Sequence, residues 1–238
     1  MFLQKLNNNW QFQNNQSDWI AAEVPGSIHL DLWNNDLIPD PFYSDNEEAI
    51  QWVSKQSWNY RLLFSLDSDI INKKNKILHF EGLDTFCEVF LNGNQILQSN
   101  NMFHPWEIDV SDLVNLEENE LLIRFKSPQE MMKSKSEESN YQLPADNDKA
   151  GGLSPFIRKA PYHFGWDWGP CLVSMGIWNF VGGRDEEEKV NGVAHLLEHM
   201  AFKGTTSKSA LQIAETIENV GGDINAYTSK EITAYYVK

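Results

Sequence analysis

Short apolar runs alternate with turn residues along the first 180 positions of this sequence. Within the runs, apolar and polar residues alternate with the period of two that predicts β-strands with one buried face. Asn92-Gly93 separates two runs, and this dipeptide favours a tight β-hairpin because both residues tolerate positive φ. Strands at this spacing predict a mainly β protein, an antiparallel β-sandwich of the jelly-roll type. The runs cover 60–66, 76–83, 87–97 and 118–126.

Two stretches depart from this pattern. Residues 129–150 are rich in Ser, Lys and Glu, and they predict a long surface loop with a turn of helix at its start. After residue 178 the periodicity becomes helical over 185–202 and 205–222, and two short alternating runs then complete the sequence. We therefore divide the chain into a β-sandwich, 1–178, and a smaller α+β segment, 179–238.

Charge and composition limit the partners of the chain. Its 34 acidic and 19 basic residues give a formal net charge of −15, which disfavours nucleic acid and anionic membranes. No apolar stretch is long enough to span a membrane and no signal peptide is evident, so we expect a cytoplasmic protein. Cys87 and Cys171 are interpreted as buried free thiols, with a disulfide as the alternative.

A histidine pair marks the second segment. His195 and His199 stand four residues apart with Glu198 between them, in the order H-x-x-E-H. On a helix this spacing places both imidazoles on one face, where they can share a zinc ion beside a carboxylate that takes a proton from water. The alternative is a surface pair of histidines with no metal. A catalytic zinc also needs a third protein ligand.

An aromatic cluster marks the end of the first segment, in RKAPYHFGWDWGP at 158–170. In a strand, Trp166 and Trp168 would share one face and Asp167 would point the other way. Indole rings stack on the apolar face of a sugar, and a carboxylate accepts hydrogen bonds from vicinal hydroxyls. The alternative, which composition alone favours, is a core Trp pair with Asp167 turned to solvent.

Seven ordered motifs resemble the N-terminal, galactose-binding-like sandwich domain of β-mannosidases of glycoside hydrolase family 2, over residues 9–178. They are VPGSIHLDL, DPFYSDNE, FEGLDTFCEVFLNG, NMFHPWEIDV, FKSP, RKAPYHFGWDWGP and GIW. The resemblance implies that Trp166 and Asp167 contact a terminal β-linked mannose, that Trp168 supports them, and that Arg158 is a further sugar-binding candidate. It implies structural roles for Pro25, Gly26, His29, Asp31 and the turn at 83–85.

In that family the sandwich packs against a (β/α)₈ barrel that carries two catalytic glutamates, and such a barrel takes about 250 residues. Only 60 residues follow Trp178, so we expect no hydrolysis by this chain alone. A weak carbohydrate-binding module is the alternative function.

Residues 181–205 and 217–236 resemble the start of a pitrilysin-type or mitochondrial-processing-peptidase-type zinc peptidase. This resemblance implies His195 and His199 as zinc ligands, Glu198 as the base that activates water, and a strand through Asn225 and Tyr227 near the metal. The family takes its third ligand from a later glutamate, which Glu215, Glu218 and Glu231 do not match.

We therefore expect weak zinc binding and no peptide cleavage, with zinc endopeptidase activity on a peptide substrate as the alternative. The whole chain is interpreted as a chimera of two truncated enzymes, since no linker separates the two patterns.

Overall fold

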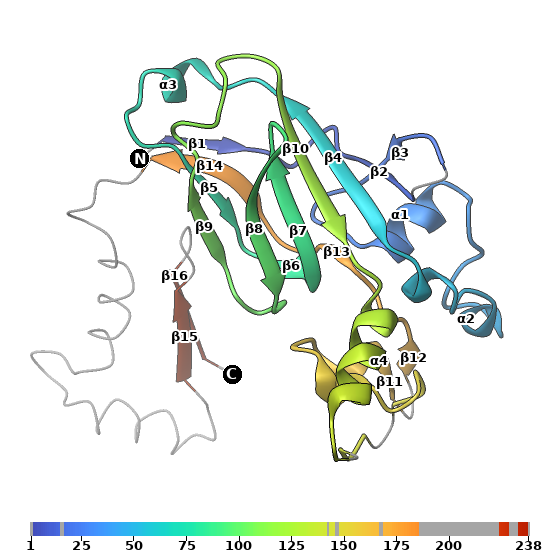
Figure 1. Ribbon diagram of the computed structural model, residues 1–238. Coiled ribbons are helices and arrows are strands. Elements are labelled where there is room, and N and C mark those ends of the chain that lie inside the picture. The colour runs from blue at the N-terminus through green and yellow to red at the C-terminus, as the bar shows by residue number, and fades with distance from the viewer. Residues whose placement is uncertain are drawn as a thin grey trace, which may run out of the picture. The chain divides into compact units, whose positions relative to one another are not determined.

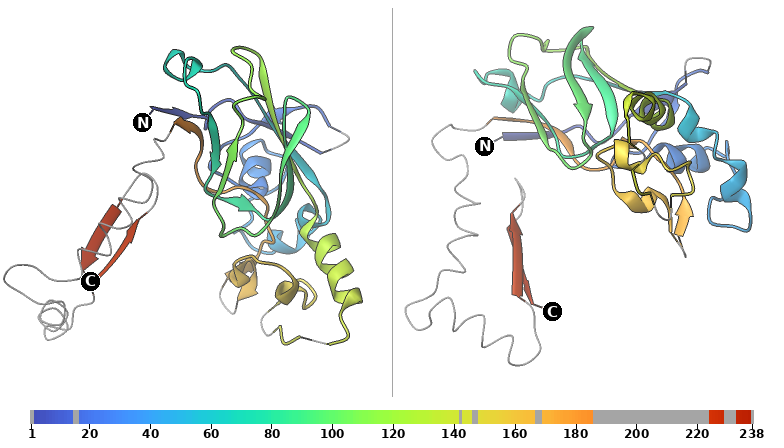
Figure 2. Two further views of the ribbon diagram at one scale, coloured as in Figure 1. Left: turned by 60° about the vertical axis from the view of Figure 1, so that its left-hand side comes forward. Right: turned by 60° about the horizontal axis from the view of Figure 1, so that its bottom comes forward.

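The structure is a computed structural model that describes residues 2–14, 17–141, 143–145, 148–166, 169–185, 224–228 and 233–237 (Figure 1). It divides into two units, Met1–Asp185 and Glu186–Lys238. The two larger sheets of the first unit, of six and four strands, are antiparallel, as the alternating pattern predicts (Figure 2). The mainly β, antiparallel fold class of this segment is confirmed.

The larger sheet has six strands, and the hairpin predicted at Asn92-Gly93 joins two of them. Asn92 and Gly93 have φ values of 50° and 80°, as a type I′ turn requires. In spatial order the strands are β3 (Ile20–Ala21), β2 (Gln11–Gln13), β4 (Trp58–Phe64), β10 (Asn119–Phe125), β7 (Phe86–Leu91) and β8 (Asn94–Asn100).

The smaller sheet has four strands and brings the two ends of the first unit together. Its order is β1 (Phe2–Lys5), β14 (Val181–Asp185), β5 (Ile77–Phe80) and β9 (Trp106–Asp109). Strand β14 pairs with β1 on one side and with β5 on the other. The boundary predicted at residue 178 therefore falls inside the sandwich, which extends to Asp185.

The core contains alternate residues of the long strands together with residues of α1, η1 and the connecting segments. Along β10, Leu121, Ile123 and Phe125 are fully buried, while the residues between them are half-buried or exposed. Fully buried Phe80 and Val181 of the smaller sheet belong to the same cluster. Burying a side chain of this size stabilises the fold by roughly 1.5–3 kcal/mol, so the alternation alone selects the strand register.

A second, smaller core lies at one end of the sandwich, below it in Figure 1. It contains Phe86, Met132, Phe164 and Cys171. The elements here are α4 (Pro128–Glu138), η2 (Ser154–Phe156), η3 (Pro161–His163), β11 (Phe164–Trp166) and β12 (Gly169–Cys171).

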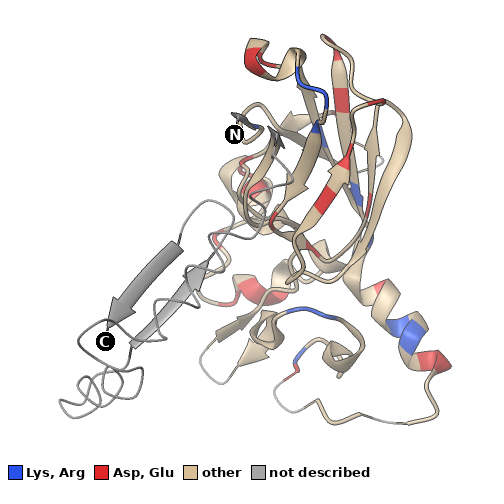
Figure 3. Ribbon diagram, turned by 90° about the vertical axis from the view of Figure 1, so that its left-hand side faces the viewer, with Lys and Arg blue, Asp and Glu red and all other residues tan. Residues whose placement is uncertain are grey.

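The prediction of a loop over 129–150 is wrong in its first part, because α4 has eleven residues. The Ser127 hydroxyl caps the helix by accepting a hydrogen bond from the Glu130 amide at 3.2 Å, and Pro128 occupies the first turn. Buried Met132 holds the helix to the second core. Residues of both charge signs occur along the helix (Figure 3). The exposed side chains of Lys133 and Glu137 form an ion pair.

Short elements complete the first unit. They are α1 (Ile28–Asn34), α2 (Asn46–Ala49), η1 (Val53–Lys55), α3 (Ser68–Ile71) and the pair β6 (Leu83–Asp84) and β13 (Gly176–Ile177). Cys87 and Cys171 are buried free thiols. Within the part of the chain that the structure describes, no helix has the length and apolar character of a membrane span.

The described part of the second unit is one antiparallel pair of strands. Strands β15 (Ile224–Thr228) and β16 (Thr233–Val237) coincide with the two alternating runs at the end of the sequence. Asp185, the predicted first residue of a helix, belongs to β14. The remainder of both predicted helices, with His195, Glu198 and His199, lies outside the described residues.

Candidate functional site

A hollow of about 690 Å³ opens at the end of the sandwich where Trp166 lies. Helix α1, η3 and the β11–β12 pair contribute its walls, together with a loop that contains Phe42. Three aromatic side chains stand at its rim: Trp166, 39% exposed, Tyr162, 63% exposed, and Phe42, 66% exposed. Its lining also includes Ser27, His29, Leu30, His163, Leu172 and Ser174.

Two close backbone approaches place α1 beside this hollow. The amides of Gly26 and Ile28 donate to the carbonyls of Ile177 and Met175, both at 2.8 Å. A Cβ at Gly26 would meet the Glu23 carbonyl oxygen at 2.2 Å, and one at Gly176 would meet the Gly26 carbonyl oxygen at 3.0 Å. Glycine is thus required at both positions, and the structural interpretation of the VPGSIHLDL motif has this physical basis.

The β11–β12 pair presents Trp166. Strand β11 ends at Trp166, which pairs with Gly169, the first residue of β12. Buried Phe164 holds β11 to the second core. The Cys171 amide donates to Glu47 Oε1 at 2.7 Å, which fixes β12 against α2. Asp167 and Trp168 lie outside the described residues.

Buried polar side chains form the floor of the hollow. His29 Nδ1 and Ser174 Oγ are 3.1 Å apart, and both residues are 5% exposed. Burial lowers the pKa of His29 to about 4, with the charge of Lys159 as a further cause, so the imidazole is neutral at pH 7. Burial and Lys159 lower the pKa of His163 to about 4 in the same way.

Lys159 forms a buried ion pair with Asp84, which holds the lysine side chain in position. Burial lowers the pKa of Lys159, and the carboxylate of Asp84 opposes this effect. His29, His163 and Ser174 are not among the site residues that the sequence predicted. The adjacent aromatics in PYHFGW were a signal for His163, whereas His29 and Ser174 are 145 positions apart and only the fold joins them.

Arg158 is not among the residues that line the hollow, although it was a sugar-binding candidate. Its side chain is exposed, and Nη1 donates to Asn100 Oδ1 at 3.3 Å. None of the described residues that line the hollow is Asp or Glu. The described walls therefore suit the binding of a small ligand with apolar faces and hydroxyl groups, and they provide no carboxylate pair for glycoside hydrolysis.

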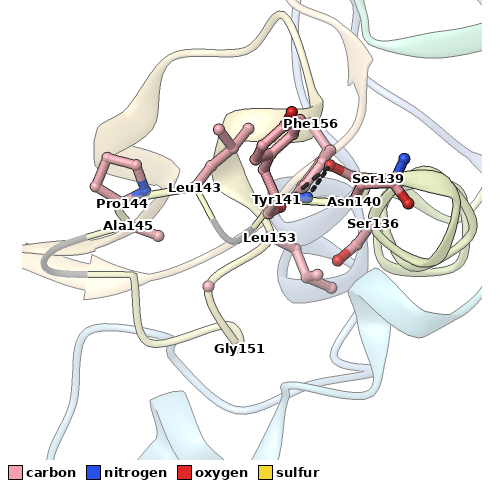
Figure 4. Close-up of a pocket in the computed structure, with 11 residues that line it drawn as sticks. Ser136, Ser139, Asn140, Tyr141, Leu143, Pro144, Ala145, Gly151, Leu153 and Phe156 are labelled. Carbon is pink, nitrogen blue, oxygen red and sulfur yellow. Dashed lines mark hydrogen bonds between the residues drawn. The ribbon is translucent and has the colours of Figure 1, made fainter.

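Two other candidate sites are weaker. A hollow of about 840 Å³ lies between α4 and η2, where Ser139 Oγ accepts a hydrogen bond from the Tyr141 amide (Figure 4). No charged side chain is among its described lining residues, so it offers no ionic contact to a ligand. Among the described residues, no group of three or more His, Cys, Asp or Glu side chains is placed to hold a metal.

The profile of the "Glycosyl hydrolase 2 galactose-binding domain-like" family matches residues 10–179, well over half of the sequence. The chain belongs to this family. The chain is similar to the enzymes named β-mannosidase B of two fungi. The Thermothelomyces thermophilus protein is 38% identical over 183 residues, which cover 74% of this chain and 21% of the relative. That of Emericella nidulans is 32% identical over 226 residues, which cover 91% of this chain and 26% of the relative.

Solved structures agree with this assignment. A β-D-mannosidase from Dictyoglomus thermophilum is 42% identical, with a TM-score of 0.73 over 77% of this chain and 22% of that protein. An exo-chitosanase from Amycolatopsis orientalis is 16% identical, with a TM-score of 0.54 over 77% of this chain and 20% of that protein, and shares the fold alone. This chain spans about a fifth of the length of the curated relatives that it matches first.

A second profile, "Insulinase (Peptidase family M16)", matches residues 171–238. It overlaps the first match at 171–179 and includes β14, which is a strand of the sandwich in this structure. The match covers less than a third of the chain and makes residues 171–238 similar to part of that family. The roles of His195, Glu198 and His199 stay predictions.

Proposed function

We propose that residues 1–185 are the sugar-side domain of a β-mannosidase, in which the hollow beside Trp166 receives the terminal β-linked mannose. The observation that carries this proposal is the position of Trp166 at the rim of an aromatic hollow with a buried polar floor. This hollow lies in a domain that is 42% identical to a β-D-mannosidase. Trp166 stacks on the sugar ring, and Asp167, by the family resemblance, accepts hydrogen bonds from its hydroxyls.

The proposal includes no hydrolysis by the 238-residue polypeptide on its own. Glycoside hydrolysis needs two carboxyl groups across the scissile bond, and the described lining residues supply neither. Leu30, Phe42 and Tyr43, which are 43%, 66% and 71% exposed, are apolar or aromatic groups on this side of the sandwich. A catalytic domain that docks here would cover these side chains and complete the site.

The test titrates methyl β-D-mannoside against the tryptophan fluorescence of the chain. We expect weak saturable quenching that Trp166→Ala removes, because half-open hollows bury only part of a ligand. Trp52→Ala is the matched control, since Trp52 is 38% exposed and does not line the hollow. Quenching that survives in Trp166→Ala contradicts the assignment of the site. Release of nitrophenol from 4-nitrophenyl β-D-mannoside contradicts the absence of hydrolysis.

The peptidase match favours a second candidate function. We propose that the chain joins the sandwich to part of a zinc-peptidase domain, and that His195 and His199 bind zinc weakly without cleaving peptide. Two imidazoles leave too many positions open for a catalytic zinc site, which uses three protein ligands.

Calorimetric titration should therefore detect zinc only at high concentration, with the heat reduced in His195→Ala. Tight one-to-one binding, with chelator-sensitive cleavage of a fluorogenic peptide that Glu198→Gln abolishes, would contradict this proposal. Glu218 and Glu231 would then be the first candidates for the third ligand.

A further inference from the structure

The outer face of the six-stranded sheet carries a polar row that crosses five strands. Asn59 on β4 pairs in register with Gln13 on β2 and with Arg124 on β10. Arg124 pairs with Glu88 on β7, and Glu88 with Gln98 on β8. These side chains point away from the core, because each of them stands next to a buried residue of its own strand. The row spans four gaps between strands, about 19 Å in all.

Aromatic rings and neighbouring polar groups hold the charged side chains of this face in place. The Arg61 guanidinium lies 4.2 Å from the centre of the Trp19 ring, and that of Arg124 lies 4.7 Å from the Phe90 ring. Arg61 Nη2 also donates to Gln11 Oε1 at 2.8 Å. Groups that are already ordered lose little conformational entropy when a ligand binds.

The row is hollowed as well as polar. A depression of about 360 Å³ lies over β2, β4, β10 and β7, and Gln13, Trp19, Asn59, Glu88 and Arg124 are among its lining residues. Lys126 Nζ closes one side and is 2.6 Å from Glu88 Oε1. An indole ring, two amides, a guanidinium and a carboxylate thus surround one depression.

The balance of charge on this face indicates the ligand. Arg61, Arg124 and Lys126 supply three positive charges, and Glu88 and Glu120 supply two negative ones, so a strong polyanion or polycation is not matched. Amide, guanidinium and carboxylate groups together donate to and accept from hydroxyls. We propose that this face binds a neutral oligosaccharide along the polar row, at a site separate from the hollow beside Trp166.

This site goes beyond the proposed function, because α1, η3 and the β11–β12 pair line the hollow beside Trp166 and none of them contributes to the depression. A polymer bound along the row would keep a polysaccharide on the domain while its end is processed elsewhere.

The experiment follows the ¹⁵N-labelled 238-residue chain by NMR as β-1,4-mannotetraose is added. We expect the indole N–H signal of Trp19 and amide signals of β4 and β10 to shift in a saturable way. Arg124→Ala should weaken this binding about tenfold, the usual effect of losing a charged hydrogen-bond donor. Trp19→Ala should abolish the saturable shifts of the β4 and β10 amides.

Control variants separate this site from the hollow beside Trp166. Trp52→Ala removes an exposed indole elsewhere and should leave the affinity unchanged. Trp166→Ala should leave the shifts on β4 and β10 intact, so that loss of one site does not affect the measurement of the other. Thermal unfolding checks that each variant is folded. The Arg124 side chain is exposed, so Arg124→Ala should disturb the core least.

Three results would overturn the proposal. The first is the absence of saturable shifts on β4 and β10 in the unmodified chain. The second is loss of these shifts in Trp166→Ala but not in Arg124→Ala. The third is tighter binding of a sulfated tetrasaccharide than of mannotetraose, with an affinity that falls as sodium chloride is added, because this would identify an anion site.

Discussion

Asp31 should make the sandwich less stable as the pH rises from about 4 to about 6. The side chain belongs to α1 and is 1% exposed. It accepts hydrogen bonds from the Glu23 amide at 2.7 Å and from the Tyr60 hydroxyl at 2.5 Å. Burial outweighs these bonds and raises the pKa of Asp31 from 3.8 to about 6.

The sign and size of the effect follow from this pKa. Below pH 3.8 the carboxyl is protonated in both the folded and the unfolded chain, and its contribution to the free energy of unfolding is fully present. Between pH 3.8 and about 6 the unfolded chain releases a proton that the folded chain retains, so the free energy of unfolding falls. At roughly 1.4 kcal/mol per pKa unit, the total fall is about 3 kcal/mol.

Asp31→Asn removes the ionisation and keeps an oxygen for the Glu23 amide. The assay is urea unfolding followed by tryptophan fluorescence between pH 4 and pH 7, for the unmodified chain and the variant. The variant should gain about 3 kcal/mol relative to the unmodified chain across this range. Other titrating groups are common to both proteins and cancel in the difference.

Tyr60→Phe gives an independent check on the same group. The Tyr60 hydroxyl donates to the carboxylate and lowers the pKa of Asp31, so its removal should move the midpoint of the fall to higher pH. A difference between the unmodified chain and Asp31→Asn that stays constant from pH 4 to pH 7 would refute the reasoning. It would mean that burial does not raise the pKa of Asp31 in the folded chain.

Three further predictions concern the ends of the sandwich. Lys159→Met should lower the free energy of unfolding by about 3–5 kcal/mol, because it leaves Asp84 buried without its partner. Lys126→Met removes a half-exposed ion pair and should lower the free energy of unfolding by less than about 1 kcal/mol. Equal losses for the two variants in urea unfolding would contradict this prediction. Because the pKa of His163 is lowered in the folded chain, the free energy of unfolding should fall by up to about 3 kcal/mol as the pH falls from 6.5 to about 4. His163→Gln should remove this loss. A variant that loses as much stability in acid as the unmodified chain would argue against the prediction. A chain that ends at Asp185 should have a melting temperature within a few degrees of that of the full chain. A chain that ends at Trp178 lacks β14, so its free energy of unfolding should be lower by more than about 3 kcal/mol. Similar melting temperatures for the two truncated chains would show that β14 is dispensable.

The sequence by itself determined the longest strands of the first unit and their faces. Burial of every second residue decides a strand, and this pattern is local, so β4, β10 and the β7–β8 hairpin could be predicted from runs of seven to eleven residues. The capping signal of α4 was also local and was outweighed by the polar composition of 129–150. Ordered motifs predicted the sandwich domain of glycoside hydrolase family 2, and the match of the galactose-binding domain-like family over residues 10–179 confirms it.

Tertiary structure alone decided where the sandwich ends and what surrounds Trp166. Strand β14 is short and contains two glycines, and it becomes a strand because it fills the gap between β1 and β5. His29 reaches Ser174 only because close backbone approaches at Gly26 and Gly176 bring α1 against the chain at 175–177. Such contacts depend on packing between positions far apart in sequence, so no local pattern of residues encodes them.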